Sequence, residues 1–246
     1  MQYAKAELEA HGFTAEVFSG AGDLKSADII LLPVPLTRDG VNINCPEARE
    51  VIPLGILDNL SENTLVFGGG KLNIKNYTDY LALDEYAVKN AALTAEGAIS
   101  YAIDNTDFSL YRSDILVIGY GRTGRVLADR LKAFAPRLTV SARSGRDFAS
   151  LDTLGIRHIK TGSIENCKTH FDIVFNTVDI KFSIGAANAL KSALFLDLSS
   201  RGGFIEGAAE QSGINYVKLP GIPGKVAPRT AGKIIAETVI NSVKGE

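Results

Sequence analysis

The chain has 246 residues, 46% hydrophobic and 22% charged, an ordinary globular composition with room for one large domain or two smaller ones. The formal net charge of −2 leaves no broad basic field, so nucleic acid is not an expected partner. No uninterrupted apolar run approaches the roughly 20 residues that cross a bilayer, and the N-terminal residues lack the apolar core of a signal peptide. We therefore expect no membrane association and a cytoplasmic protein.

The cysteines and histidines argue against a disulfide framework or a metal site. The cysteines, Cys45 and Cys167, are too few for a disulfide scaffold and lack metal-ligand spacing. The histidines His11, His158 and His170 are scattered along the chain. We therefore expect no bound metal.

The first hundred residues predict a small α/β domain. A helix over 1–12 is closed by Gly12, and a long helix over 84–103 ends the region. The strands expected between them lie at 15–19, 28–35 and 64–70. Because an open α/β sheet usually begins with a strand, whereas this chain opens on a helix, we expect the N-terminal domain, residues 1–104, to lack its usual first strand.

From residue 114 onward, short apolar strands alternate with helical stretches. This alternation predicts parallel strands joined by right-handed crossovers and covered on both faces, a doubly wound Rossmann sheet that we place at residues 105–225. The expected strands are 114–119, 137–141, 156–159, 171–176, 193–198 and 215–218. The expected helices are 122–135, 146–154, 183–190 and 204–212. A last helix over 227–244 lies in the segment 226–246, which we expect to join the N-terminal domain.

The stretch ILVIGYGRTGRVLADRL, residues 115–131, places the spacing GxGxxG between a strand and a helix. Gly119 can make the tight turn, Gly121 lets the backbone approach a pyrophosphate, and Gly124 lets the helix pack close to the strand. The free N–H groups and partial positive charge of a helix N-terminus suit an anion. The sequence therefore predicts a dinucleotide site; the alternative is a glycine turn that binds no ligand.

The end of the second Rossmann strand indicates which dinucleotide binds. An NAD-binding protein usually places Asp or Glu there for the ribose hydroxyls, whereas this chain has Ala142, Arg143 and Ser144, and an arginine fork suits the 2′-phosphate of NADP. We therefore expect NADP; the alternative is a solvated arginine, with Asp147 accepting from the ribose. The expected cofactor-binding residues are Gly119, Gly121, Arg122, Thr123, Gly124, Ala142, Arg143, Ser144, Asn176, Thr177 and Val178.

Three later loops end at the carboxyl edge of the predicted sheet, where ligands bind in open α/β folds. One begins at Asn176, one follows Asp197, and a stiff proline- and glycine-rich loop carries Lys225 and Arg229. Each loop alone is also ordinary turn chemistry, with Asp197 as a helix cap. The convergence of the three loops on one edge favours a polar cleft.

Four segments carry a family resemblance. They are EYAVKNAALTAEGAI (85–99), VIGYGRTGRVLADRLKAF (117–134), LDLSSRGGF (196–204) and LPGIPGKVAPRTAGKIIAE (219–237). With these segments the chain resembles the A subunit of dipicolinate synthase, the sporulation enzyme of endospore-forming bacteria. The last segment is the most specific, because generic dehydrogenases do not carry it. Family members start earlier, with a strand and a GGD-like turn that this sequence lacks.

The resemblance implies NADP-linked oxidation of a dihydrodipicolinate-type ring, formed from a 4-hydroxy-tetrahydrodipicolinate precursor, to pyridine-2,6-dicarboxylate. It places this activity in the mother cell of a sporulating bacterium. It also implies a flavoprotein-like partner, the B subunit. The substrate is then a small dicarboxylate, and we further expect a homo-oligomer.

Because the implied substrate is a cyclic dianion, fixed cations are expected in its site. The catalytic candidates are Glu96, Arg201 and Lys225. For a dehydration step the candidate acid–base groups are Glu96, Thr94 and Asp197, and the alternative for Glu96 is a surface helix residue. The expected substrate-binding residues are Thr94, Ser199, Ser200, Arg201, Gly202, Gly203, Lys225 and Arg229. Two other interpretations stay open: another two-domain NADP-dependent dehydrogenase, or a cofactor-binding subunit that is inactive without its partner.

Overall fold

The computed structural model describes residues 1–18, 20, 24–45, 48–133 and 135–245. The chain forms two compact units: unit 1 comprises Met1–Asn90 with Ala227–Glu246, and unit 2 comprises Ala91–Val226. The first boundary lies inside the long helix α2 (Asp84–Asp104), whereas the sequence interpretation placed it after residue 104.

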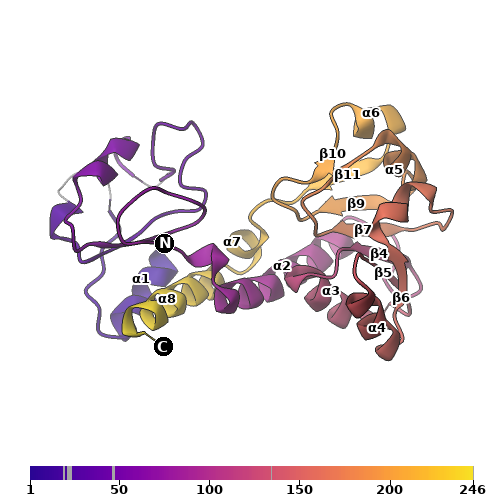
Figure 1. Ribbon diagram of the computed structural model, residues 1–246, viewed down its shortest axis with the longest axis horizontal. Helices are drawn as coiled ribbons and strands as arrows, with labels where there is room; N and C mark the ends of the chain where they lie inside the picture. The colour runs from indigo at the N-terminus through magenta and orange to yellow at the C-terminus, as the bar shows by residue number, and fades with distance from the viewer. Residues whose placement is uncertain (19, 21–23, 46–47, 134, 246) are drawn as a thin grey trace. The chain divides into compact units, whose positions relative to one another are not determined.

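Unit 1 is built from both ends of the chain. Helix α1 (Gln2–Ala10) lies beside helix α8 (Pro228–Lys244), as Figure 1 shows. The two helices approach so closely at Gly232 that a Cβ there would lie 2.7 Å from the Cβ of Tyr3. The C-terminal helix therefore completes the unit that the N-terminal helix begins.

The sheet of unit 1 is small. In the described part of this unit, parallel strands β1 (Ile29–Leu31), β2 (Leu65–Gly68) and β3 (Tyr77–Asp79) pair in the order β1-β2-β3. The expected strand 28–35 is shorter because Pro33 and Pro35 have no N–H to donate. The expected strand 15–19 is wrong for residues 15–18, which have no regular structure, and residue 19 lies outside the described residues.

Unit 2 carries a parallel sheet whose strand order identifies its architecture. In the described part of this unit, six strands pair in the order β6-β5-β4-β7-β9-β11. The strands are β4 (Asp114–Ile118), β5 (Arg137–Ala142), β6 (Arg157–Lys160), β7 (Ile173–Asn176), β9 (Leu194–Asp197) and β11 (Asn215–Lys218). In chain order this is 3-2-1-4-5-6, the arrangement of dinucleotide-binding doubly wound folds. The predicted Rossmann sheet is confirmed.

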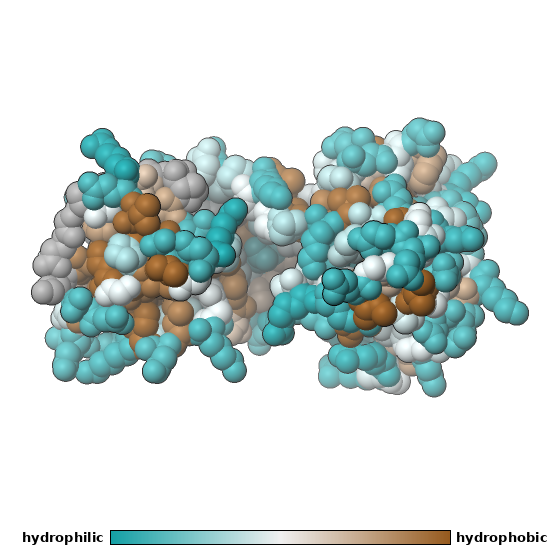
Figure 2. Space-filling view, turned by 90° about the horizontal axis from the view of Figure 1, so that it is seen from above, coloured by the Kyte–Doolittle hydropathy of each residue, from teal (hydrophilic) through white to brown (hydrophobic). Residues whose placement is uncertain are grey.

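The helices of unit 2 follow the strands and cover both faces of the sheet. Besides the greater part of α2, they are α3 (Arg122–Lys132), α4 (Gly145–Thr153), α5 (Ile184–Ala189), α6 (Ala208–Ser212) and α7 (Ile222–Val226). Successive side chains of a strand point to opposite faces, so Ile115 and Val117 pack in the core with Leu127 of α3, whereas Leu116 and Ile118 pack in the core with Ala186 of α5. Figure 2 shows hydrophobic residues on the surface as separate patches among hydrophilic ones.

The remaining elements are short. They include the 3₁₀ turns Leu24–Ser26, Leu54–Asn59, Tyr80–Ala82 and Thr161–Asn166 and the two-residue strands β8 (Lys181–Phe182) and β10 (Gly203–Phe204), which pair with each other. The helix expected over 204–212 therefore begins only at Ala208. The helix expected over 122–135 ends at Lys132, and residue 134 lies outside the described residues.

Helix α7 interrupts the stretch that the sequence interpretation took as a stiff loop. Ile222 is buried, and its Cγ2 lies where a Cβ on Gly97 of α2 would be. The Cγ2 of Val226 would lie 2.8 Å from the same Cβ. A residue larger than glycine at position 97 would therefore push α7 away from α2.

Candidate active site

The sheet of unit 2 reverses its strand order at β4, with β5 on one side and β7 on the other. In open α/β folds a ligand binds at the carboxyl ends of the strands beside such a reversal. The loops after β4 and β7 meet here: the N–H and the Oγ1 of Thr177 both donate to the carbonyl of Ile118 at 2.9 Å. The structure therefore brings the predicted glycine loop and the segment 176–178 together.

The three glycines of this loop have different surroundings. Gly119 has a φ of +101°, and a Cβ on it would lie 2.5 Å from Cγ1 of Val178. A Cβ on Gly124 would collide with the carbonyl oxygen of Gly119. Gly121 has an ordinary φ of −80°, and a Cβ on it would meet nothing within 4 Å. Gly119 and Gly124 are thus required by the turn, whereas Gly121 leaves open space beside the backbone.

Helix α3 starts directly after this open position. Gly121 is its N-cap residue and has no side chain to accept from the first-turn N–H groups. Those groups carry the partial positive charge of the helix N-terminus and can bind an anion. Arg122, which is exposed, and Thr123, which is half-buried, lie in the same turn. The loop has the space and the charge that a diphosphate needs.

Arginine and serine follow the end of β5, where Ala142 is buried and Arg143 and Ser144 are exposed. Among the described residues Arg143 has no polar partner. Ser144 caps α4 by accepting from the N–H of Asp147 at 3.1 Å and donates to its carboxylate at 2.7 Å. Hydrogen bonds from Ser144 and Arg125 hold the pKa of Asp147 below its ordinary value. Asp147 is therefore already engaged, which disfavours its use as a ribose acceptor.

The sequence interpretation did not single out Arg125, which ties this region together. Its Nη2 lies 3.0 Å from Oδ1 of Asp147, and its Nε donates to the carbonyl of Tyr120 at 3.0 Å. The guanidinium also lies 5.0 Å from the centre of the Tyr120 ring. Arg125 thus links the glycine loop to the start of α4. Its pairing with Asp147 of α4 joins residues 22 positions apart and is visible only in the fold.

A buried polar network lies beneath the ends of β7, β9 and β11. The carboxylate of Asp197 is fully buried and accepts from Asn176 Nδ2 at 2.8 Å, from Ser199 N and Oγ at 3.0 and 2.5 Å, and from Tyr216 Oη at 2.8 Å. Lys218 Nζ lies 3.1 Å from its Oδ2. Burial raises the pKa of Asp197, but these hydrogen bonds outweigh burial and hold the pKa below its ordinary value.

Asp197 therefore does more than cap a helix, the role that the sequence suggested as an alternative. As an ionised carboxylate it accepts from groups on the two neighbouring strands, β7 and β11, and on the loop that follows β9. Burial of the ring, followed by the hydrogen bond to Asp197, raises the pKa of Tyr216, so this phenol stays a donor. The network fixes the position of the loop that carries Ser200 and Arg201.

The loop 199–203 presents its residues unequally. Ser199 and Gly202 are buried, and a Cβ on Gly202 would lie 2.5 Å from the carbonyl oxygen of Val178. Ser200 is exposed. The Arg201 side chain is 87% exposed, and its Nε is 3.7 Å from Oδ2 of Asp179. Arg201 is therefore available to a ligand at the surface and lies outside the buried network, while the buried Gly203 pairs with Lys181.

Two lysines at the carboxyl edge of the unit 2 sheet are absent from the site residues predicted from the sequence. Lys181 and Lys218 both donate to the carbonyl oxygen of Gly202, at 3.0 and 3.2 Å. Lys218 ends the strand 215–218, so the rule that strand ends carry ligand groups could have found it. Lys181 lies in a two-residue strand that no sequence pattern announces.

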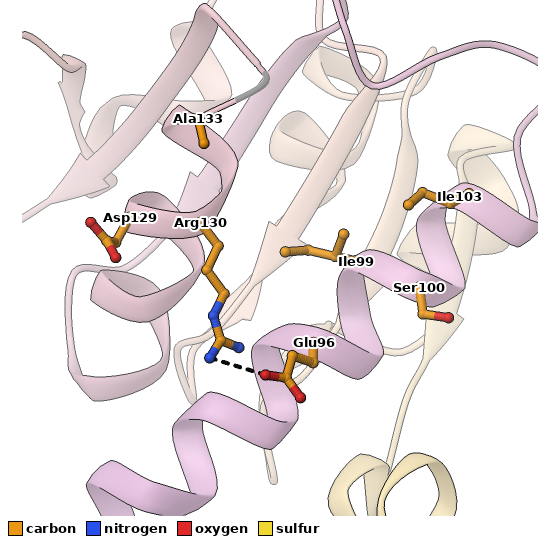
Figure 3. Close-up of a pocket in the computed structure, with 7 residues that line it drawn as sticks. All are labelled: Glu96, Ile99, Ser100, Ile103, Asp129, Arg130 and Ala133. Atoms are coloured by element: carbon orange, nitrogen blue, oxygen red, sulfur yellow. Dashed lines mark ion pairs between the residues drawn. The ribbon is translucent and has the colours of Figure 1, made fainter.

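Glu96 and Thr94 lie on α2. Arg130 of α3 reaches across to Glu96, with 3.1 Å between Nη2 and Oε1 (Figure 3). Arg130 also donates to the carbonyl of Ala92. Glu96 and Arg130 line a hollow of about 640 Å³ with Ile99, which points toward α3. Arg130 follows Arg122 by eight residues, about 12 Å along the helix. The structure thus pairs Glu96 with Arg130 away from the glycine loop, and Thr94, half-buried, lies on the same helix.

The two remaining candidate cations belong to different units. Lys225 is exposed on α7 of unit 2, and Arg229 is exposed in the first turn of α8 of unit 1.

Within the described residues, no group of three or more His, Cys, Asp or Glu side chains is arranged to hold a metal ion. No helix in the described part of the chain is long and apolar enough to span a membrane.

Comparisons with known proteins give a consistent result, although no family model matches the chain. A curated relative, the A subunit of dipicolinate synthase from Bacillus subtilis (strain 168), is 31% identical over 249 aligned residues, which cover 93% of this chain and 82% of the relative. The crystal structure of the dipicolinate synthase A subunit from Bacillus halodurans superposes with a TM-score of 0.87 at 24% identity, covering 98% of this chain and 93% of that one. The apo-structure of D-lactate dehydrogenase from Escherichia coli shares the fold, with a TM-score of 0.62 at 17% identity over 100% of this chain and 95% of that one.

Proposed function

Because the chain belongs to the family of the dipicolinate synthase A subunit, we propose that it binds NADP at the carboxyl edge of the unit 2 sheet and oxidises a dihydrodipicolinate-type ring to pyridine-2,6-dicarboxylate. The observation that carries the cofactor part of this proposal is the contrast among the three glycines. Gly119 and Gly124 are packed against the protein, whereas Gly121 faces open space at an uncapped helix N-terminus. Open space and free N–H groups together are what a diphosphate requires.

The residues present fit the two halves of the dinucleotide. Arg143 and Ser144, with Arg122 of the glycine loop, supply the cation and hydroxyl for a 2′-phosphate beside Ala142. The described residues of β5 end without a carboxylate, and the nearby Asp147 carboxylate is paired with Arg125. On the other side of β4, Asn176, Thr177 and Val178 would line the nicotinamide half. Thr123 completes the first turn of α3.

When bound, NADP⁺ would supply the hydride acceptor that this oxidation needs, and the ring would lose one proton and become aromatic. Aromatisation supplies much of the driving force, so the chain is left with orientation, exclusion of water and placement of charge. The fixed loop 199–203 suits this task, because the Asp197 network holds it from below.

For the substrate we propose a dicarboxylate held by cations and hydroxyls of the loops. Arg201 would pair with a carboxylate as a bidentate fork, and Lys225 and Ser200 of the same unit would add to the site. Buried Ser199, Gly202 and Gly203 would shape it, and Thr94 would line it. The Arg130 ion pair of Glu96 favours a structural role for that carboxylate over acid–base catalysis.

A partner belongs to the proposal because the relatives are named as one lettered component of a synthase. We propose a second, flavoprotein-like component, the B subunit, together with assembly into a homo-oligomer and action in the cytoplasm of the mother cell of a sporulating bacterium. An isolated chain that binds NADP but turns over only with its partner would be a cofactor-binding component rather than a complete enzyme.

The test is calorimetric titration of the purified chain with NADP, NAD and dipicolinate, followed by an assay of NADPH formation from freshly made dihydrodipicolinate. We expect NADP to bind more tightly than NAD, and dipicolinate to bind as the product. The assay is repeated with the B subunit. A chain that binds neither dinucleotide contradicts the proposal.

A further inference from the structure

Two ammonium groups converge on one backbone oxygen at the carboxyl edge of unit 2. Nζ of Lys181 lies 3.0 Å, and Nζ of Lys218 lies 3.2 Å, from the carbonyl oxygen of Gly202. They come from separate elements, β8 and the end of β11. A carbonyl oxygen is neutral and does not balance the charge of two ammonium groups. Both groups therefore remain able to bind an anion.

The charges at this place do not cancel. Lys218 also contacts the buried Asp197 carboxylate at 3.1 Å, whereas the Gly202 oxygen is the polar partner of Lys181 among the described residues. Of the two ammonium groups only that of Lys218 contacts a carboxylate, so this pair of lysines with Asp197 carries an excess positive charge. An ammonium has three N–H donors, so both lysines keep donors that these contacts do not use. The Lys218 side chain is 35% exposed and Lys181 is exposed, so solvent reaches both.

The cluster lies on the nicotinamide side of the predicted cofactor site. Val178 connects the two places: its Cγ1 contacts the Gly119 position, and its carbonyl oxygen contacts the Gly202 position. Strand β11 is three strands from β4 and four from β5. At about 4.8 Å per strand, Lys218 is about 14 Å across the sheet from the glycine loop and about 19 Å from the end of β5. The end of β11 therefore lies farther across the sheet from the diphosphate and 2′-phosphate positions than the end of β7, the strand next to β4.

We propose that Lys181 and Lys218 form a carboxylate subsite that binds one of the two carboxylates of the ring substrate. This inference rests on the proposed function and names residues that recognise its substrate class. Asp197 keeps Lys218 in place, and the Gly202 carbonyl holds both ammonium groups at one point. A substrate carboxylate would accept hydrogen bonds from the remaining N–H donors and would neutralise the excess positive charge.

The experiment compares charge-removing and charge-retaining variants of the full-length chain by calorimetric titration with dipicolinate and, separately, with NADP. Lys181→Gln is expected to weaken dipicolinate binding on the order of tenfold, the loss of one charge-assisted hydrogen bond. Lys181→Arg keeps the charge and is expected to stay within about threefold of the wild type. NADP binding is expected to be unchanged in both variants.

A matched control and a second variant sharpen the test. Lys191→Gln removes an exposed lysine just before the amino end of β9, at the opposite edge of the sheet, and is expected to change neither affinity. Lys218→Gln is expected to weaken dipicolinate at least as much as Lys181→Gln, and unchanged NADP binding shows that this variant is folded.

The outcomes separate the subsite from the proposed function. Dipicolinate binding that is equal in wild type and Lys181→Gln overturns the subsite and leaves the function standing. If Lys181→Gln weakens NADP binding as much as dipicolinate binding, the subsite proposal is also overturned. The lysine would then affect every ligand at this edge of the sheet and would not be specific for the substrate carboxylate. A wild-type chain that binds NADP but not dipicolinate overturns the proposed substrate, and the subsite with it.

Discussion

The side-chain amide of Asn176 donates to the carboxylate of Asp197 at 2.8 Å, joining residues that are register partners at the carboxyl ends of β7 and β9. Both side chains are fully buried. Because the same carboxylate holds Ser199 and Lys218, the strand ends and the loop above them form one connected polar layer. The shape of the candidate active site therefore depends on a charge that solvent does not reach.

Replacing Asp197 with Asn is expected to destabilise unit 2 by about 2–4 kcal/mol at pH 7, because the Lys218 ammonium loses its counter-ion and a buried acceptor becomes a donor. The folded-state pKa of Asp197 lies below its ordinary value of 3.8. Its contribution is therefore complete above about pH 4 and is lost as the pH falls through the lower, folded-state pKa. Denaturant unfolding at pH 7 and pH 3 measures the free energy of unfolding of the wild type and of Asp197→Asn. The difference in unfolding free energy between the two proteins is expected to be smaller at pH 3.

The control for that experiment is Asp129→Asn, which changes an exposed carboxylate on α3. It is expected to alter stability by less than about 0.5 kcal/mol at either pH. A difference between Asp197→Asn and wild type that stays constant with pH would mean that Asp197 is not ionised in the folded chain.

Replacing Gly121 with Val is expected to abolish NADP binding while leaving the fold intact. The new side chain occupies the open space beside the first turn of α3, and the φ of −80° suits any residue. Calorimetry measures the binding, and circular dichroism with thermal unfolding measures the fold. A Gly121→Val protein that binds NADP like the wild type would show that this space is not the diphosphate site.

Gly124→Ala is the contrasting variant in the same loop. Its Cβ would collide with the carbonyl oxygen of Gly119, so the helix must shift, and we expect a loss of about 1–3 kcal/mol in stability. Position 121 thus reports on the ligand, whereas position 124 reports on packing.

Arg143→Ala is expected to reduce the preference for NADP over NAD by about tenfold or more, because the 2′-phosphate loses a charge-assisted partner that NAD never uses. Arg137→Ala removes an exposed arginine at the amino end of the same strand, where it pairs with Asp114 at 3.3 Å. That control is expected to leave the preference unchanged. Equal affinities of the wild type for NADP and NAD would refute the assignment.

Gly97→Ala is expected to destabilise unit 2 by about 1–3 kcal/mol, because the added methyl group overlaps Ile222 of α7. The same displacement would move Lys225, so dipicolinate affinity is expected to fall with stability. Gly224→Ala, in α7 itself, adds a methyl group with nothing within 4 Å and is expected to be tolerated. Equal unfolding midpoints for the two variants would contradict the packing of α7 on α2.

The sequence predicted the Rossmann sheet well because its strands are short apolar runs such as residues 115–118, which can only be buried on both faces. It predicted the glycine loop for a related reason: Gly119 and Gly124 are required by local geometry within a few residues. It did not predict β8 and β10, because a two-residue strand has no periodicity. Helix α7 was missed because its proline and glycine indicate a loop, while the contact that holds it, Ile222 on Gly97, joins residues far apart in the chain.

The candidate site was predictable only in part. The loops follow from the rule that ligands lie at the carboxyl ends of strands. Which cation a loop presents depends on backbone direction and on partners from other elements. Lys218 is positioned by Asp197 on a neighbouring strand, and Arg125 by Asp147 on the next helix. Neither pairing can be predicted from the neighbouring sequence, because each joins residues that are distant along the chain.

Helix α8 packs on α1, so both ends of this sequence belong to unit 1. During synthesis on the ribosome, every strand of the unit 2 sheet emerges before α8 does. Unit 2 can therefore fold before α8 is available to unit 1, the reverse of the usual N-terminal-first order. A nascent chain that has been synthesised only as far as Val226 lacks α8. The side of α1 that packs on α8 in the folded unit would then be exposed to solvent or to a chaperone.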